Sequence, residues 1–264
     1  MHSDKIISLK NPKIKSIVGL REHYRRSDYT LIEGKREVLQ ALAAGIEVKE
    51  IFICPDEFKK HGIDIALPKF SSLRVPVYET TPEVFAKISY GDRREGILAV
   101  GKPRILSLKD FQLSPNPFLV ILEGIEKPGN LGAILRTSVA AGVDGVILSD
   151  PKTDVYNPNV IRASLGTVFS VQTAVSSKEE TLKFLRTKGI RIIASFPSAE
   201  TSYTQINFKE PLCLVVGSEE KGLSSFWMKQ ADGKIKIPMF GKIDSLNVSV
   251  SAAILLYEVR RQRG

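Results

Sequence analysis

The sequence has few of the residues that build disulfides and metal centres, and it has no apolar run long enough for a membrane span. It holds two cysteines and three histidines in 264 residues. All three histidines lie in the first quarter of the chain, and no cysteine or histidine is near enough to make a zinc-ligand spacing, so no metal is expected. Cys213 lies in an apolar run, where a thiol usually packs as a small hydrophobe. No apolar run approaches the roughly 20 residues that a membrane helix needs.

An export signal is also lacking. The start, MHSDKIISLK, has charges but no apolar region after them and no small-residue cleavage site, which predicts a cytoplasmic protein. Hydrophobic residues make up 43% of the chain and charged residues 25%. These values are ordinary for globular proteins, and the length suits one large or two modest domains.

Positive charge is in excess and is unevenly distributed. The net charge is +9, and residues 1–26 hold seven Lys and Arg against two Asp and Glu, a net charge of +5. A basic segment attracts polyanions such as nucleic acid, although it also serves simple solubility. Charge alone leaves both interpretations open.

The order of apolar segments predicts two α/β domains. Residues 1–101 predict a small unit, and residues 102–117, which contain three prolines and no periodicity, suit a linker. Residues 118–264 alternate continuous apolar runs with helical stretches, which is typical of a parallel sheet covered on both faces. In the first domain we expect a basic helical start, strands at 29–33, 48–54, 75–78 and 96–100, and helices at 34–44 and 81–88. In the second we expect apolar strands or helices at 119–122, 131–141, 143–148, 182–188, 190–195, 212–216 and 246–262.

Three polar segments of the second domain each follow a predicted strand, where open α/β sheets bind ligands. In the first, Pro128-Gly129-Asn130 opens a helix whose free N–H groups suit an anion, and Arg136 follows about two turns later. In the second, Ser218-Glu219-Glu220 comes directly after Gly217. Neither G-x-G-x-x-G nor the P-loop pattern occurs, so the usual nucleotide motifs are excluded.

The third polar segment, Ser245-Leu246-Asn247, leads into the C-terminal helix. A strand at 235–237 and the turn Pro-Met-Phe-Gly precede it. The helix is apolar almost all round, which predicts burial on several sides, with a partner subunit as one source of cover.

Together these segments resemble the SpoU/TrmH family of the SPOUT methyltransferase superfamily. The sequences NLGAILRT, GSEEKGL and IPMFGKIDSLNVSVSAA carry the resemblance, supported by NVIRASLGTVF with Arg162, Ser164 and Gly166. KNPKIKSIVGL and YTLIEGKREVLQALAAGIEVKEIFI resemble, more loosely, the ribosomal-protein-like substrate-binding domain of many family members.

The resemblance implies an α/β fold with a SPOUT-type trefoil-knotted parallel-sheet catalytic domain, preceded by a small α/β RNA-binding domain. It implies S-adenosyl-L-methionine as cofactor and a homodimer packed through the knot and the C-terminal helix. The residues that it implies around the cofactor are Ser195, Gly217, Ile237, Pro238, Leu246 and Asn247.

The family pattern also marks a reacting constellation, which comprises Asn130, Arg136, Glu219, Ser245 and Asn247. Because a guanidinium stays protonated, Arg136 suits an anchor for phosphate or for negative charge developing at O2′. Glu219 is our leading candidate to orient a group or accept a proton. The second domain has no histidine, which excludes histidine catalysis from its own residues.

The expected activity is methylation of a ribose 2′-hydroxyl in RNA, with large-subunit ribosomal RNA favoured and transfer RNA as the alternative. A non-catalytic RNA-binding or ribosome-assembly protein and a small-molecule methyltransferase are the competing classes. The motif residues oppose the first, and the basic N-terminal domain opposes the second. We expect phosphate contacts from five N-terminal residues, Lys10, Lys13, Lys15, Arg21 and Arg25.

Overall fold

The computed structural model describes residues 4–23, 27–60, 75–90 and 95–264, which form two compact units. The N-terminal unit comprises Met1–Arg104 and Tyr156–Ser170, and the C-terminal unit comprises Ile105–Val155 and Val171–Gly264. Residues 105–117 of the expected linker therefore pack with the C-terminal unit. Within the described ranges, every helix is too short or too polar to cross a membrane.

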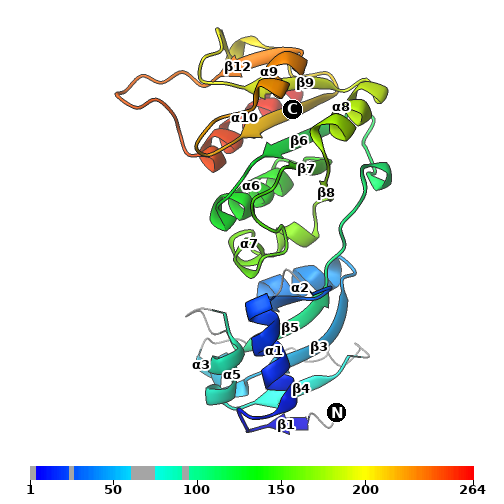
Figure 1. Cartoon of the computed structure of the whole chain (residues 1–264), viewed down its shortest axis with the longest axis vertical. Coiled ribbons are helices and arrows are strands. Elements are labelled where there is room, and N and C mark those ends of the chain that lie inside the picture. Colours follow the sequence, from blue (N-terminus) through cyan, green and yellow to red (C-terminus); the bar gives the residue numbers. More distant parts are fainter. Residues whose placement is uncertain (1–3, 24–26, 61–74, 91–94) are drawn as a thin grey trace. The chain divides into compact units, whose positions relative to one another are not determined.

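The described strands of the N-terminal unit form a mixed five-stranded sheet in the order β1-β4-β3-β5-β2. Helices α1 and α5 bury their apolar side chains against the sheet, and α2 packs on β2 and β5 (Figure 1). The elements are β1 Asp4–Ile6, α1 Pro12–His23, β2 Thr30–Glu33, α2 Lys35–Ala43, β3 Glu47–Ile53, α3 Pro55–Lys60, β4 Val77–Thr80, α5 Pro82–Ile88 and β5 Ile97–Lys102.

Local signals account for much of this unit. Thr81 caps α5 by accepting a hydrogen bond from the Val84 N–H at 3.3 Å, as its position before a short apolar helix predicts. The basic start differs from the expected helix, because Asp4 to Ile6 form an edge strand parallel to β4 before α1 begins. That pairing joins positions more than 70 residues apart, and local periodicity does not reveal it.

Residues 156–170 return to the N-terminal unit as helix α7 (Pro158–Ala163) and a short 3-10 helix (Thr167–Phe169). The Thr30 hydroxyl donates a 2.8 Å hydrogen bond to the Tyr156 carbonyl. Arg162 Nη1 donates to the Tyr90 carbonyl at 3.1 Å. Residues 156–170 therefore pack with the N-terminal unit, although they lie in the second half of the sequence.

The described strands of the C-terminal unit form a seven-stranded parallel sheet in the order β10-β12-β9-β11-β6-β7-β8, which confirms the parallel α/β prediction. Its elements are β6 Phe118–Glu123, α6 Pro128–Ala140, β7 Gly145–Ser149, β8 Thr173–Val175, α8 Lys178–Thr187, β9 Arg191–Ser195, β10 Thr201–Ser202, β11 Leu212–Gly217, α9 Ser225–Gln230, β12 Gly233–Lys236 and α10 Val248–Arg263. Short 3-10 helices lie at Leu108–Asp110 and Tyr203–Gln205.

Helices cover both faces of this sheet (Figure 1). One face packs against α8, α9 and the segment around Phe111, with Trp227 fully buried. On the other side, α6 and α10 pack together, and α10 also contacts β11. Two side chains of α10, Val250 and Tyr257, are about half exposed, so one stripe of this apolar helix is left without cover in the single chain.

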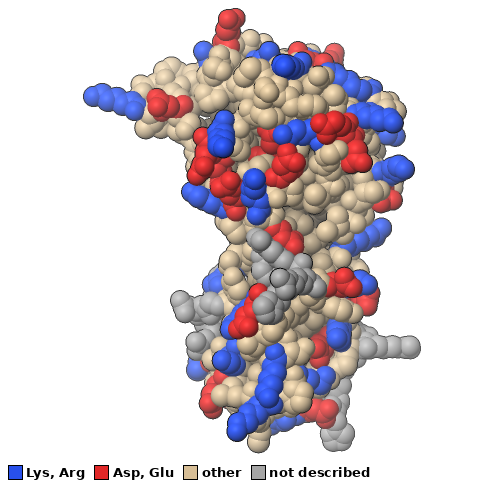
Figure 2. All heavy atoms as spheres, viewed as in Figure 1, with Lys and Arg blue, Asp and Glu red and all other residues tan. Residues whose placement is uncertain are grey.

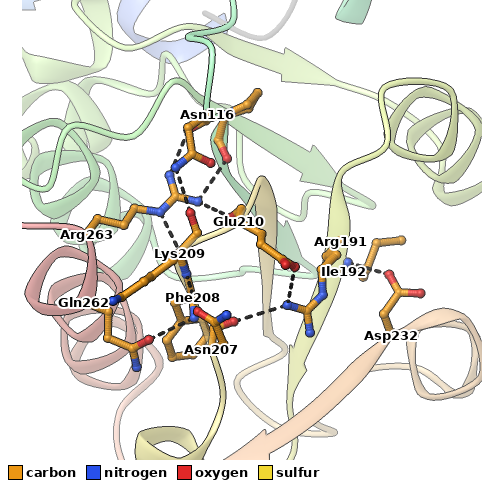
Figure 3. A network of polar contacts seen from close by, with 11 residues as sticks. Asn116, Arg191, Ile192, Asn207, Phe208, Lys209, Glu210, Asp232, Gln262 and Arg263 are labelled. Atoms are coloured by element: carbon orange, nitrogen blue, oxygen red, sulfur yellow. Dashed lines mark hydrogen bonds and ion pairs between the residues drawn. The ribbon is translucent and has the colours of Figure 1, made fainter.

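Hydrogen bonds join the C-terminal end of α10 to the amino edge of the sheet (Figure 3). Arg263 donates hydrogen bonds to the backbone carbonyls of four residues, at 2.5 to 3.4 Å. Gln262 Oε1 accepts a further bond from the Phe208 N–H at 2.9 Å. The four carbonyls belong to Asn116, Pro117, Phe208 and Glu210.

Candidate active site

The three polar segments meet at the carboxyl edge of the C-terminal sheet, beginning where β6 and β11 lie side by side. Gly217 is in register with Glu123. It has φ of +136°, and a Cβ at this position would overlap the Glu123 backbone carbonyl. Only glycine fits this conformation and this close approach, which explains the residue at the end of β11.

Glu219 joins the second segment to the first. Its Oε1 accepts a hydrogen bond from Asn130 Nδ2, and its Oε2 accepts one from the Lys127 N–H at 3.3 Å. The carboxylate therefore lies at the N-terminus of α6, where the helix dipole favours a negative charge. We expected this helix start to suit an anion, and within the chain that anion is Glu219.

Asn247 connects the third segment to the same group. Its Nδ2 donates to Asn130 Oδ1 at 3.2 Å. As the N-cap of α10, its Oδ1 accepts from the Ser249 N–H at 2.9 Å and from the Ser249 hydroxyl at 2.6 Å. Capping fixes the direction of the Asn247 side chain. Three of the five expected catalytic residues thus form one hydrogen-bonded chain, from Glu219 through Asn130 to Asn247.

Arg136 and Ser245, the other two, are not part of this chain of hydrogen bonds. Arg136 lies on α6 with its side chain exposed, and Ser245 is exposed in the loop before α10. Neither side chain has a hydrogen bond or ion pair with any residue that the structure describes. Both are accessible to a bound molecule.

The expected cofactor residues follow neighbouring strands at the same edge. Ser195 ends β9 and is in register with Ile235 of β12, while β11 lies on the other side of β9. Ile237, Pro238 and Leu246 are half-exposed apolar residues beyond the strand ends. Backbone groups beside half-covered apolar side chains fit the adenosine and methionine parts of S-adenosylmethionine, so the residues present suit this cofactor.

Sequence reasoning missed a charge cluster built around one buried carboxylate beside these segments. Glu123, at the end of β6, is only 4% exposed. Its carboxylate accepts hydrogen bonds from Ser224 and lies 2.9 Å from Lys178 Nζ, which also lies 2.9 Å from Asp150. Hydrogen bonds with Glu123 and then with Asp150 raise the pKa of Lys178 above its ordinary value. The available signal was an acidic residue closing an otherwise apolar strand.

The expected RNA-contacting residues differ in how far they are engaged. Lys10 and Lys15 are exposed. Lys13 forms a 3.2 Å ion pair with Glu50 and lies 4.5 Å from the Tyr78 ring centroid. A hydrogen bond with Tyr78, and then one with Glu50, raises the pKa of Lys13.

Arg21 is also engaged within the N-terminal unit. Its Nη1 donates to the carbonyls of Lys87 at 3.3 Å and Ser89 at 3.0 Å. Arg25 lies outside the described residues. The structure therefore leaves Lys10 and Lys15 as the freely exposed members of the expected set.

Both parts of the chain match known protein families. Residues 117–257 match the SpoU rRNA Methylase family, and residues 11–99 match the MRM3-like substrate binding domain. A 23S rRNA (guanosine(2553)-2′-O)-methyltransferase, RlmP of Bacillus subtilis (strain 168), is 27% identical over 97% of this chain and 98% of its own length.

Two solved structures are similar over almost the whole chain. A crystal structure of an RNA 2′-O ribose methyltransferase is 37% identical, with a TM-score of 0.84, and covers 98% of this chain and 99% of its own. The AdoMet-bound rRNA methyltransferase from Sinorhizobium meliloti is 28% identical, with a TM-score of 0.87, and covers 98% of each chain.

The fold and the site define a methyltransferase with a separate substrate-binding unit. The chain belongs to the SpoU rRNA Methylase family, because the family model matches more than half of it. It is an S-adenosylmethionine-dependent RNA 2′-O-methyltransferase, as the motifs predicted.

Proposed function

We propose that this chain methylates a ribose 2′-hydroxyl in large-subunit ribosomal RNA. The observation that carries the choice of RNA is the N-terminal unit, which matches a substrate-binding domain over residues 11–99. The same arrangement extends over nearly the full length of the Bacillus subtilis relative, whose name specifies 23S rRNA. Transfer RNA is the second candidate, because the methyltransferase site itself does not distinguish the two.

The chemistry requires the ribose oxygen to approach the methyl group in line, so positioning supplies much of the acceleration. When bound, S-adenosylmethionine supplies the activated methyl group on its sulfonium. We assign Arg136 to hold a phosphate of the RNA or to stabilise negative charge developing at O2′, since its guanidinium is exposed and stays protonated. The exposed hydroxyl of Ser245, two residues before Asn247, is assigned to contact the ribose.

We assign Glu219 an orienting role in preference to that of proton acceptor. Both of its carboxylate oxygens already accept hydrogen bonds, from Asn130 Nδ2 and from the Lys127 N–H. Asn130 Oδ1 is in turn held by Asn247. The hydrogen-bonded chain therefore sets the direction of the Asn130 amide, and such a fixed dipole is the kind of group that can stabilise charge without reorganising.

Phosphate contacts by Lys10 and Lys15 are proposed to hold the RNA. Such contacts position a nucleic acid without reading its sequence. Among the residues that the structure describes, basic side chains are mixed with acidic ones on the face seen in Figure 2 and do not gather into one patch there. RNA shape and exposed loops would then supply the recognition that charge does not.

We further infer a trefoil knot and a homodimer, as the family resemblance implies, and an enzyme that acts in the cytoplasm. The uncovered stripe of α10 supports the dimer, with Val250 46% and Tyr257 53% exposed. Phe240, in the loop before α10, is 98% exposed, and such apolar surfaces usually mark interfaces. Copies of the chain that pack through α10 would cover these side chains.

The test is transfer of labelled methyl groups from S-adenosylmethionine to separated ribosomal and transfer RNA pools. We expect label in large-subunit ribosomal RNA, recovered as an alkali-resistant dinucleotide, and none with Arg136→Ala. Label confined to transfer RNA would reverse the choice of substrate. Measurable cofactor binding with no label in any RNA would favour a non-catalytic RNA-binding or ribosome-assembly role.

A further inference from the structure

Glu123 holds both ends of the turn that carries Glu219. We call residues 218–223 the Glu219 turn. Before it, Gly217 lies against the Glu123 backbone with no room for a side chain. After it, the Ser224 N–H donates to Glu123 Oε2 and the Ser224 hydroxyl donates to Oε1, each at 2.7 Å. One residue of β6 thus fixes where the turn leaves the sheet and where it returns.

The Ser224 hydroxyl does not form the capping hydrogen bond that is usual at its position. Ser224 is the N-cap of α9, a position where serine usually accepts a hydrogen bond from the helix backbone. Here its side chain makes no such bond and contacts Glu123. Within the turn, Ser218 bridges to Gly222, and its hydroxyl accepts from the Lys221 N–H at 3.3 Å. The turn is therefore closed by its own bonds and attached to the sheet through Glu123.

Burying the charge of Glu123 to attach the turn is unfavourable in free energy. Removing a carboxylate from water is unfavourable unless a cation and hydrogen bonds compensate it, and a compensated pair often adds little stability. Lys178 supplies the cation, at 2.9 Å from both Glu123 and Asp150. The arrangement therefore specifies geometry more than it stabilises the fold, and the geometry concerned is that of Glu219.

We propose that Glu123 is a positioning residue for methyl transfer: by fixing both ends of the Glu219 turn, it places the Glu219 carboxylate against Asn130. Among the described residues, Glu123 has no hydrogen bond or ion pair with Asn130 or Asn247, so it acts through the turn. The proposal rests on the methyltransferase activity and not on the choice of RNA.

The opposite edge of the same sheet provides a matched control. Asp144 accepts hydrogen bonds from the Ser114 N–H at 2.8 Å and from the Ser114 hydroxyl at 3.1 Å, and also from the Phe118 N–H at 2.7 Å. The chemistry is the same as between Glu123 and Ser224, but it lies at the amino ends of the strands. Asp144→Asn therefore reports what such a contact contributes to the fold alone.

The direct test observes Asn130 without any substrate. In protein labelled with ¹⁵N-asparagine, the side-chain amide signal of Asn130 is identified by its loss in Asn130→Ser. We expect Glu123→Gln to move this signal toward the position of ordinary exposed asparagines, and Asp144→Asn to leave it unchanged. An unmoved signal in Glu123→Gln, or an equal movement in both variants, overturns the proposal.

Kinetics supply a second test, with the RNA pool that accepts label. We expect kcat of Glu123→Gln to fall about 10- to 100-fold while KM for RNA stays unchanged. Asp144→Asn should remain within about 2-fold of the parent, as expected of a change distant from the chemistry. Combining Glu123→Gln with Glu219→Gln should add little to the loss from Glu219→Gln alone, because both act on one contact. If the loss of kcat in the double variant equals the product of the losses in the two single variants, the proposal is overturned.

Ser224→Ala keeps the carboxylate and removes one donor, and serves if Glu123→Gln fails to fold. Its expected loss of kcat is about 3- to 10-fold, again absent on a Glu219→Gln background. A kcat equal to that of the parent would contradict the proposal. If no RNA accepts label, the ¹⁵N experiment still decides the role of Glu123, so failure of the proposed substrate and failure of this inference remain distinguishable.

Discussion

The two edges of the C-terminal sheet use polar side chains in different ways. At the amino edge, the guanidinium of Arg263 binds four backbone carbonyls (Figure 3). At the carboxyl edge, Glu219, Asn130 and Asn247 bind one another through their side chains. The first arrangement satisfies backbone groups and holds the C-terminus. The second fixes the directions of side chains that are partly or fully exposed, as a reacting site requires.

Parallel topology explains why the proposed chemistry lies at one edge only. Loops that leave the carboxyl ends of strands lead to helix N-termini, whose N–H groups and dipoles face the same space. The N-terminus of α6 and the capping residue of α10, Asn247, both lie there. The amino edge receives helix C-termini, and Arg263 at the end of α10 suits that environment.

The largest effect that would sharpen this comparison is expected from Glu219→Gln. The amide removes the negative charge at the start of α6 and one of the two acceptors that hold the turn, so kcat should fall about 100-fold. Because Glu219 is half-exposed, the free energy of unfolding should change by less than about 1 kcal/mol. Steady-state kinetics and urea unfolding measure the two quantities. If the loss in the free energy of unfolding were as large as the rise in activation free energy, the distinction between the two edges would be wrong.

Arg263→Ala should show the opposite pattern. Four carbonyls lose a charged donor, and we expect a loss of about 3 kcal/mol in the free energy of unfolding. Activity per folded molecule should be unchanged at a temperature where the variant is folded. Arg263→Lys retains the charge but not the planar fork of donors, so it should recover only part of the stability. A large fall in kcat at full folding would contradict the structural role.

Glu33, in the N-terminal unit, tests what a buried carboxylate does when it has no ion pair with any described residue. Burial raises its pKa to about 7, against the Tyr90 N–H and the Arg162 charge, which lower it. The folded state therefore keeps a proton that the unfolded chain releases near pH 4.5, so stability should fall as pH rises from about 4.5 to 7.

Glu33→Gln should remove this slope and stabilise the protein at pH 8 by about 1 to 2 kcal/mol. Urea unfolding at pH 5, 6, 7 and 8 measures the slope in parent and variant. Equal slopes in the two proteins would show that Glu33 does not titrate in this range.

The smallest effects are expected away from both edges, among the lysines of the N-terminal unit. Replacing Lys10 and Lys15 with Gln should weaken RNA binding about 10-fold at physiological salt and reduce the salt slope by about 1 to 2. Lys13→Gln should change the slope less, because Glu50 already pairs with Lys13. Filter binding across a salt series measures both. An equal loss for Lys13→Gln would show that RNA displaces the internal partner.

Much of the catalytic half was predictable from the sequence, for a physical reason. Strands buried on both faces read as continuous apolar runs, and β6, β9 and β11 lie where those runs are. Glycine, asparagine and glutamate in the segments that follow such strands indicated the edge that we propose to be reactive, and three of the five expected residues form one hydrogen-bonded chain there. The rotation of Arg136 away from Asn130 was also foreseeable from helix geometry.

Features that depend on distant pairing were not predictable. The edge strand β1, the return of residues 156–170 to the N-terminal unit and the contact between Glu123 and Ser224 each join segments far apart in sequence. The pairing of side chains was equally hidden, because Lys13 and Lys15 look alike in sequence while only Lys13 has an acidic partner among the described residues. Local composition shows which residue types are present, but not which of their side chains already have a partner within the fold.

The most direct test of the central claim is the single-turnover rate of methyl transfer by Asn130→Ala, with RNA and S-adenosylmethionine both saturating. Asn130 is the middle member of the hydrogen-bonded chain at the carboxyl edge, so the predicted result is a rate lower by about 100-fold, with Arg263→Ala at the parental rate under the same conditions. A parental rate in Asn130→Ala would contradict the account, because the chain from Glu219 to Asn247 would then not be part of the reacting site.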